Sequence, residues 1–219
     1  MIPHTTTNSG LHPFVAQRVL ARFARPGLRA LDLGSGPGAM AERLASLGCT
    51  VTAADRDVSG YQASPPARAV DFDQTDFASA LGAGQFDLVT AIEVIEHVES
   101  PIGFLKNVAR LLSPAGLAVI TTPNVDSLPA RVKFLLAGKI RTMDEYGEPT
   151  HICPIFCDLL QRQFLPRAGL RLKEHLFFPP DGFQLSRRPL ALLFRAVATV
   201  LPGYALLGDN HVFVLEHSS

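Results

Sequence analysis

An acid followed by alternating glycines is the first feature whose residue types could do chemistry. Asp32 lies within the short apolar segment 30–33. Glycines follow it at alternate positions: Gly34, Gly36 and Gly38. Glycine permits a tight turn and lets a ligand approach bare backbone. The spacing of apolar residues from Met40 to Leu47 then predicts a helix. The free amides and the positive end of that helix would point at the turn. Strand, glycine turn and helix in this order predict the start of a nucleotide-binding unit.

A second acid ends the next apolar segment. Residues 49–54 predict a buried strand, and Asp55 follows it. It lies about 20 residues after the first glycine, where dinucleotide-binding folds place a ribose-binding acid. The two oxygens of a carboxylate match the vicinal hydroxyls of a ribose. Helix capping is the alternative role, for which Asp57 is also available. We therefore expect Asp55 to bind a ribose without a 2′-phosphate.

Residues 86–101 form the second informative stretch. Phe86 to Ala91 predicts a central strand, and Ile92 to Val98 predicts a turn across the end of the sheet. The stretch reads Phe-Asp-x-Val and then Glu-Val-x-Glu-His-Val before a proline. Together with Asp-x-Gly-x-Gly-x-Gly at 32–38 and Thr-Thr-Pro-Asn at 121–124, it resembles the class I, Rossmann-like S-adenosylmethionine-dependent methyltransferases. The similarity is to the ubiquinone O-methyltransferase type, within the methyltransferase type 11/23 family.

The resemblance covers about residues 11–176 and implies an α/β, Rossmann-like fold in one domain, residues 1–219. We expect a doubly wound sheet of seven strands, the last antiparallel, with helices on both faces. Three further segments are expected: a mobile arm at 1–10, a helical lid over the substrate at 125–156 after the fifth strand, and a helical insertion at 179–208. Ser113 to Gly116 predicts a turn in which Gly116 has a positive φ.

The resemblance also implies which residues hold the cofactor, S-adenosyl-L-methionine. A carboxylate near the glycine turn suits its ammonium and sulfonium groups. The third strand tip, by strand order, faces the adenine, so Asp71 is expected to accept from the exocyclic amine, with Asp73 as the alternative. The residues assigned to the cofactor are Asp32, Gly34, Ser35, Gly36, Gly38, Asp55, Arg56, Asp71, Phe72, Ile92 and Glu93.

The implied reaction is an in-line displacement at the sulfonium methyl group, for which positioning supplies most of the rate. A general base is needed only if the acceptor atom carries a proton. His151, in the expected lid, is the first candidate, and His97, four residues after Glu93, is the second. For both, a purely structural role is the alternative. The acceptor is expected to be a small molecule methylated at an oxygen.

Polar residues of the lid are candidates for binding that acceptor: Arg131, Lys133, Tyr146 and His151. A leading helix is predicted over 11–25, and in the family such a helix lies over the cofactor. His12 could therefore approach the ligand, but a surface histidine near a helix start is the preferred interpretation.

Composition restricts partners and surroundings. The net charge is +0, hydrophobic residues make up 47% and charged residues 18%, so a nucleic-acid partner is not indicated. Three cysteines, Cys49, Cys153 and Cys157, are too few for a disulfide framework, and packed thiols in the cytoplasm are expected. His151 lies near two of them, but no metal set is convincing. No secretory signal or membrane span is predicted.

Three other functions remain open. The first is a nucleotide-sugar or nicotinamide enzyme, in which residues 93–101 would have no role. The second is a protein that binds the cofactor without transferring its methyl group. The third is a module that contacts a membrane surface or a partner through the amphipathic segment 187–201, although packing of that helix on its own domain is preferred.

Overall fold

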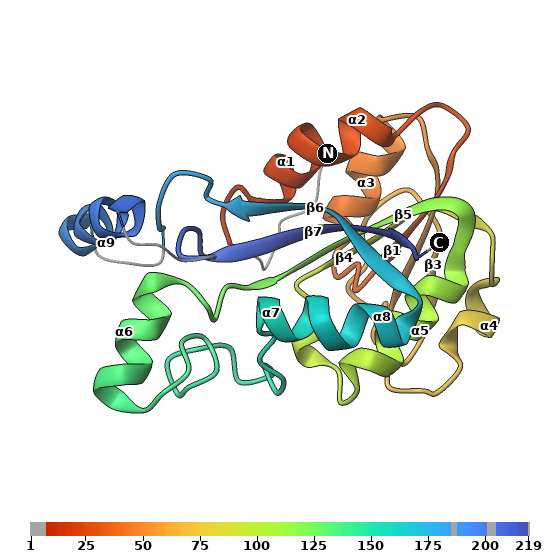
Figure 1. The fold of residues 1–219 in the computed structure, drawn as a ribbon. Helices are drawn as coiled ribbons and strands as arrows, with labels where there is room; N and C mark the ends of the chain where they lie inside the picture. The colour runs from red at the N-terminus through yellow and green to blue at the C-terminus, as the bar shows by residue number, and fades with distance from the viewer. Residues whose placement is uncertain (1–7, 185–187, 201–204, 219) are drawn as a thin grey trace.

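A seven-stranded sheet carries the fold (Figure 1). The computed structural model describes residues 8–184, 188–200 and 205–218. The strands lie in the order β3-β2-β1-β4-β5-β7-β6, and β7 runs antiparallel to both of its neighbours. Their bounds are β1 Arg29–Leu33, β2 Thr50–Asp55, β3 Ala67–Ala69, β4 Phe86–Ile92, β5 Leu112–Pro123, β6 Leu170–Phe178 and β7 Asn210–His217. The expected doubly wound sheet with one antiparallel strand is confirmed.

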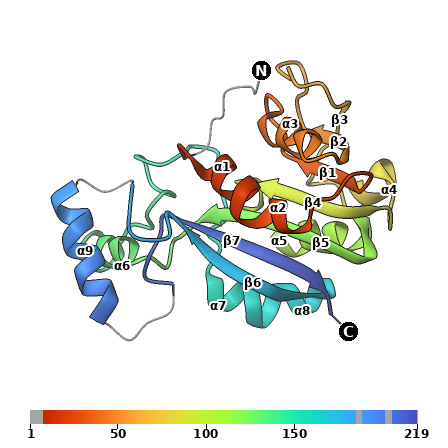
Figure 2. The ribbon, with the colours of Figure 1, turned by 90° about the horizontal axis from the view of Figure 1, so that it is seen from above.

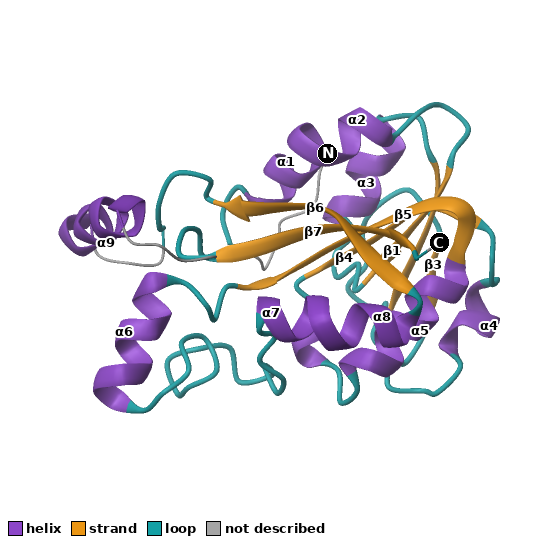
Figure 3. Cartoon of the chain, viewed as in Figure 1, coloured by secondary structure: helices purple, strands orange, loops and turns teal. Residues whose placement is uncertain are grey.

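One face of the sheet is covered by the leading helix and by the helix after the glycine turn. The leading helix consists of α1 (Leu11–Val15), a π-helical turn (Ala16–Leu20) and α2 (Ala21–Phe23), and the second helix is α3 (Ala39–Ser46). Their buried side chains pack on alternate residues of the central strands, such as Ala30. The colours of Figure 3 show this layer above the strands.

The opposite face is covered by the helices α4 (Phe77–Leu81), α5 (Pro101–Leu111), α7 (Cys157–Leu159) and α8 (Leu165–Ala168), with a π-helical turn, Leu160–Phe164, joining the last two. Each of the first two begins with a side-chain cap, Asp76 and Ser100, which accepts a backbone N–H of the first turn. Leu31 and Leu33 point to this face, whereas Ala30 points to the other. Strand β1 is therefore buried on both of its faces.

Two helices lie away from these layers, beyond the carboxyl ends of the parallel strands. They are α6 (Leu128–Ala137) and α9 (Arg188–Val200), and they pack against each other (Figure 2). Both expose large apolar side chains: Phe134, Leu135 and Leu136 on α6, and Leu190, Leu192, Leu193 and Val200 on α9. No helix in the described ranges combines the length and the apolar character that crossing a membrane requires.

The structure corrects two local expectations. Gly116 does not have a positive φ, because β5 continues through residues 113–116 as a bulge opposite β4. A Cβ on Gly116 would lie 2.7 Å from the Phe86 carbonyl oxygen, so close backbone approach explains this glycine. The third strand, which the sequence predicts over residues 67–72, ends at Ala69. Of the expected arm, residues 1–7 lie outside the described residues, and Asn8 donates a hydrogen bond to Asn210 at 2.6 Å.

Candidate active site

A cavity of about 1050 Å³ lies at the carboxyl ends of the strands. One part of its wall comes from the glycine turn and the strand tips: Gly34, Ser35, Gly36, Asp55, Phe72, Ile92 and Glu93. Another part comes from segment 125–156 and the turn after β4: His97, Thr142, Tyr146, His151 and Ile152. The cavity is as large as the largest typical ligand pockets, about 300–1,000 Å³, so it has room for a cofactor and a second ligand.

The glycine turn is fixed by the strand beside it. The N–H groups of Gly34 and Ser35 both donate to the Ala54 carbonyl, at 2.8 and 3.1 Å. Gly34 has a φ of +68°, and a Cβ there would lie 2.3 Å from Cγ2 of Val94, so no larger residue fits. A Cβ at Gly36 would meet nothing within 4 Å, so open space lies beside this residue on the cavity wall. The turn is therefore a bare-backbone surface of the kind a nucleotide needs.

Gly38 has a different role from the other two glycines. It precedes α3 in the left-handed conformation, and a Cβ there would lie 2.4 Å from Ala63 and 2.8 Å from Tyr61. It does not line the cavity. Its contribution is to start the helix and to let the loop at 61–63 pack closely.

Asp55 lies on the cavity wall at the tip of β2. Its Oδ2 accepts from the Gly36 N–H at 2.7 Å, and its Oδ1 accepts from the Asp57 N–H at 3.2 Å. These bonds fix the carboxylate beside the glycine turn and leave lone pairs on both oxygens. The structure thus brings together the two features that the sequence assigned to one ligand.

Asp32 is not on the cavity wall. It alternates with Leu31 and Leu33, so its side chain points beneath α3 and is 1% exposed. Thr90 Oγ1 donates to its Oδ1 at 2.8 Å, and its Oδ2 has no hydrogen-bond partner. Burial raises the pKa of Asp32 to about 7. Asp32 therefore lies below the glycine turn and not on the wall where a direct contact with the cofactor was expected.

At the third strand tip the structure separates the two candidate acids. Arg56 pairs with Asp71 at 2.9 Å and with Asp73 at 2.6 Å. Asp73, Phe72 and Arg56 line the cavity, whereas Asp71 does not. Asp73 also accepts from the Glu99 N–H at 2.8 Å. Of the two acids considered for the adenine contact, Asp73 therefore lies on the cavity wall and Asp71 does not.

Glu93 ties three strands together at the cavity. It has a φ of +57°, which is uncommon for a residue with a side chain. Thr121 on β5 donates to its Oε1 at 3.1 Å, and Asn210 on β7 donates to its Oε2 at 2.9 Å. Burial raises the pKa of Glu93 to about 7, against the lowering effect of those two bonds. Its carboxyl group is thereby held in one orientation on the cavity wall.

His97 and His151 lie in contact on the wall. Their ring centroids are 4.7 Å apart, edge to face. Nδ1–H of His97 donates to the Thr150 carbonyl, and Nδ1–H of His151 donates to the Thr142 carbonyl, both at 3.0 Å. In each ring this leaves Nε2 as the acceptor. Burial lowers the pKa of His97, which favours the neutral ring.

A fully buried acid, Glu96, supports this pair. Its backbone carbonyl accepts from the N–H groups of Ile152 and Cys153, both at 3.0 Å, which fixes the chain beside His151. Its carboxyl oxygens have no hydrogen-bond partner, and Oε1 lies 4.0 Å from Nε2 of His151. Burial, and next the charge of Glu93, raises the pKa of Glu96 well above its usual value. Glu96, His97 and His151 also offer ligand atoms within 4.8 Å of one another, close enough to hold a metal ion.

Five further residues differ from or extend the expectations. His12 is 7% exposed, lines the cavity and has no partner for either nitrogen, so its interpretation as a surface histidine is wrong. Burial lowers the pKa of His12 to about 4. Tyr146 reaches the cavity although it is 84% exposed, whereas Arg131 does not line it and donates to the Asp126 carbonyl at 2.7 Å. Asn8 and Asp209 also line the cavity, and no local pattern in the sequence identifies them.

Comparisons with known proteins show to which family the chain is similar. The model of a methyltransferase domain family matches residues 10–175. Ubiquinone biosynthesis O-methyltransferases are similar in sequence. The one from a Caulobacter species is 37% identical over 51% of this chain and 50% of its own length, and that from Parvibaculum lavamentivorans is 34% identical over 70% and 64%. The one from Dinoroseobacter shibae is 34% identical over 86% and 83%. The chain thus spans about half to two thirds of the first two relatives.

Solved structures share the fold at low sequence identity. A methyltransferase from Archaeoglobus fulgidus, described as dependent on S-adenosylmethionine, has a TM-score of 0.65 and 18% identity, and the match covers 93% of each chain. Another is the 1,6-didemethyltoxoflavin-N1-methyltransferase from Burkholderia thailandensis, solved with bound 1,6-didemethyltoxoflavin and S-adenosylhomocysteine. It has a TM-score of 0.61 and 16% identity, and the match covers 98% of this chain and 80% of that one.

The fold and the family match define a class I, Rossmann-like methyltransferase. The chain belongs to the methyltransferase-domain family, and the S-adenosylmethionine-dependent class that the motifs indicated is confirmed.

Proposed function

We propose that this chain transfers the methyl group of S-adenosylmethionine to an oxygen of a small-molecule acceptor. One observation carries the proposal: a single cavity is lined both by the glycine turn with Asp55 and by the histidine pair of His97 and His151. The first set suits a nucleoside, and the second suits proton removal from an acceptor. In this proposal, segment 125–156 acts as the lid over the acceptor.

The chain's residues fit the cofactor. Asp55 would hold the ribose hydroxyls, Phe72 and Asp73 would contact the adenine, and the backbone at Gly34 and Gly36 would face the rest of the ligand. Ser35 Oγ is buried and has no hydrogen-bond partner, which leaves a polar group available to a ligand. Asp32 would act from below the turn and not by direct contact. When bound, the cofactor supplies an activated methyl group that needs only an aligned nucleophile.

Proton removal is the task proposed for the histidine pair. Because each Nδ1–H is held by a carbonyl, Nε2 is the atom that could accept a proton from a hydroxyl. His151 is the proposed base, with His97 as the second choice. Oε1 of the buried Glu96 lies 4.0 Å from Nε2 of His151, beside the proposed base.

The acceptor class is proposed from the relatives and the wall. Several relatives are named for O-methylation in ubiquinone biosynthesis. Apolar residues on the wall, including Ile92, Val94, Val98 and Ile152, suit a ring that carries the reacting hydroxyl. Tyr146 would lie at the edge of the acceptor's path. We propose a hydroxylated aromatic compound, such as a catechol.

The test is a transfer assay that follows S-adenosylhomocysteine formation with a catechol, and it compares wild type with His151→Gln and His97→Gln. A general base is worth about 10²- to 10⁴-fold in rate, so the variant that lacks it should lose that factor. Its affinity for S-adenosylhomocysteine should change less than threefold. Unchanged rates in both variants would refute the assignment of the base. Cofactor binding without turnover on any acceptor would favour the alternative of a binding protein.

A second candidate role is contact with a membrane surface. It is favoured by the exposed apolar side chains of the packed helices α6 and α9, notably Phe134, Leu135 and Leu192. Residues 187 and 201 of the segment predicted for this role lie outside the described residues. Flotation with liposomes tests the idea, and Leu192→Glu should reduce any flotation. A cytoplasmic location is proposed only because no disulfide joins Cys49, Cys153 and Cys157.

A further inference from the structure

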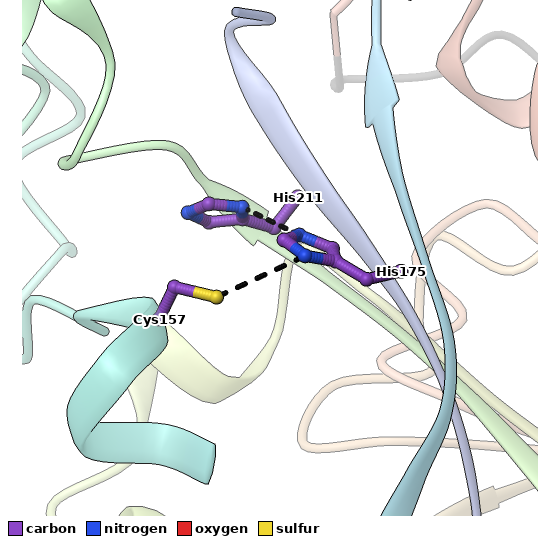
Figure 4. Close-up of side chains that lie close together, drawn as sticks. All are labelled: Cys157, His175 and His211. Atoms are coloured by element: carbon purple, nitrogen blue, oxygen red, sulfur yellow. Dashed lines mark hydrogen bonds between the residues drawn. The ribbon is translucent and has the colours of Figure 1, made fainter. Parts of the chain in front are cut away.

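A second group of side chains of the types that can bind a metal ion lies outside the cavity. Cys157 at the start of α7, His175 on β6 and His211 on β7 converge there (Figure 4). Cys157 Sγ is 3.9 Å from Nδ1 of His175, and Nε2 of His175 is 3.0 Å from Nδ1 of His211. None of the three lines the cavity described above. The proposed methyl transfer uses none of them.

The strand register creates this group. His175 is opposite Phe213 on β7, so His211, two residues away, projects from the same face. The π-helical and helical layer that contains Cys157 packs on that face. Asp126, in the loop after β5, reaches the same place: its Oδ2 accepts from the Cys157 N–H at 2.7 Å and lies 3.9 Å from Nε2 of His211.

The environment leaves one nitrogen without a partner. His211 is fully buried, and its Nε2 makes no hydrogen bond. A buried unpaired nitrogen is costly, so it calls for a partner. A metal ion bound to Nε2 would supply that partner.

The distances suit a small tetrahedral ion. With metal–nitrogen bonds of about 2.0 Å and metal–sulfur bonds of about 2.3 Å, ligand atoms lie roughly 3.3–3.6 Å apart. One donor atom from each of Cys157, His175 and His211 lies within 4.8 Å of the others. The separation of 3.9 Å between Cys157 Sγ and Nδ1 of His175 would need to shorten by a few tenths of an ångström.

We propose that Cys157, His175 and His211 form a site for Zn²⁺, with Asp126 beside the ring of His211 and outside the ligand group. Sulfur and imidazole nitrogen are donors that zinc prefers, whereas Mg²⁺ and Ca²⁺ prefer oxygen. Binding would displace the thiol proton to solvent, because the thiolate is the ligand. The ion would join α7 to β6 and β7. Since α7 directly follows the lid segment, the ion would anchor the end of that segment to the sheet.

Cobalt titration of the wild-type protein tests the site directly. Bound Co²⁺ with a thiolate ligand should show a sulfur-to-cobalt charge-transfer band in the near ultraviolet, with one equivalent bound, and Zn²⁺ should abolish the band. The group of Glu96, His97 and His151 contains no sulfur and cannot produce it. Binding of one equivalent without this band, or no binding, would overturn the proposal.

Variants locate the ligand atoms. Cys157→Ser should remove the band and weaken zinc binding by at least the 10- to 100-fold that loss of an outer-shell group typically costs. Cys153→Ser is the matched control, because Cys153 is a nearby free thiol outside the cluster, and the band should persist. Loss of the band in Cys153→Ser with retention in Cys157→Ser would overturn the assignment. Near-ultraviolet circular dichroism checks that both variants are folded.

Hydrogen exchange tests the anchoring role. Added Zn²⁺ should slow exchange of amides in residues 152–157 of wild type and should have no effect on Cys157→Ser. Equal exchange with and without saturating Zn²⁺ would show that the ion does not anchor the lid.

Discussion

Replacing Asp55 by alanine is the sharpest test of the cofactor assignment. The carboxylate is held by the N–H groups of Gly36 and Asp57 at 2.7 and 3.2 Å, so it is positioned before any ligand binds. A hydrogen bond to a charged group contributes about 1.5–3 kcal/mol. Two such bonds to ribose hydroxyls amount to about 3–6 kcal/mol, or roughly 10²- to 10⁴-fold in affinity. Asp55→Asn retains one acceptor oxygen and should lose about half of that free energy.

Calorimetric titration with S-adenosylhomocysteine measures the effect, with nicotinamide dinucleotide as the ligand control. Asp57→Asn is the matched variant, because it changes a neighbouring carboxylate that does not line the cavity, and its affinity should stay within about twofold of wild type. The melting temperature of each variant shows whether the fold is retained. A folded Asp55→Ala protein that binds within threefold of wild type would refute the ribose assignment.

Three further predictions concern the turn and its neighbours. Gly34→Ala should destabilise the protein by a few kcal/mol in urea unfolding, and Val94→Ala should recover only part of the loss, because it removes the clash but not the positive φ. Asp32, with its folded pKa raised to about 7, contributes stability that is present below about pH 4 and lost as the pH rises to 7. The unfolding free energy of Asp32→Asn minus that of wild type should therefore rise across that pH range, by about 4 kcal/mol at most. A difference that does not change with pH would contradict the argument that burial raises the pKa of Asp32. Asp73→Asn should weaken S-adenosylhomocysteine binding more than Asp71→Asn; the reverse order would restore Asp71 as the adenine contact.

The sheet could be predicted from the sequence because its signals are local. Strand β4 is apolar except for Asp87 and Thr90, and glycines at alternate positions after β1 favour a tight turn. Helix bounds differ from the expected ones by only a residue or two, as for α3, which was expected over 40–47 and spans 39–46. The prediction of a positive φ at Gly116 was wrong for a physical reason. This glycine is needed because the backbone of Phe86 lies close to it, and the sequence alone does not distinguish that need from a positive φ.

The site was less predictable because burial and pairing are long-range. The sequence places Asp32 next to the glycine turn, but the alternation of β1 turns its side chain under α3. Asp71 and Asp73 differ only in which of them faces the cavity, although Arg56 binds both. His12 lies near a helix start, where a polar side chain is usually exposed, yet it is only 7% exposed. The approach of Cys157 to His211 likewise depends on a strand pairing that no local pattern reveals.

The position of β7 has a consequence for biosynthesis. It is the last strand to be made, yet it lies between β5 and β6, with Ala118 paired to Leu215 and Leu170 paired to His217. A nascent chain that has emerged only as far as α9 must therefore hold two strands with unpaired edges, which are open to aggregation and to chaperones. Closure of the sheet then requires insertion between them, a non-local event that is slow compared with helix formation. Ribosome-bound chains stalled before Asn210 should be digested by protease much faster than chains that include β7.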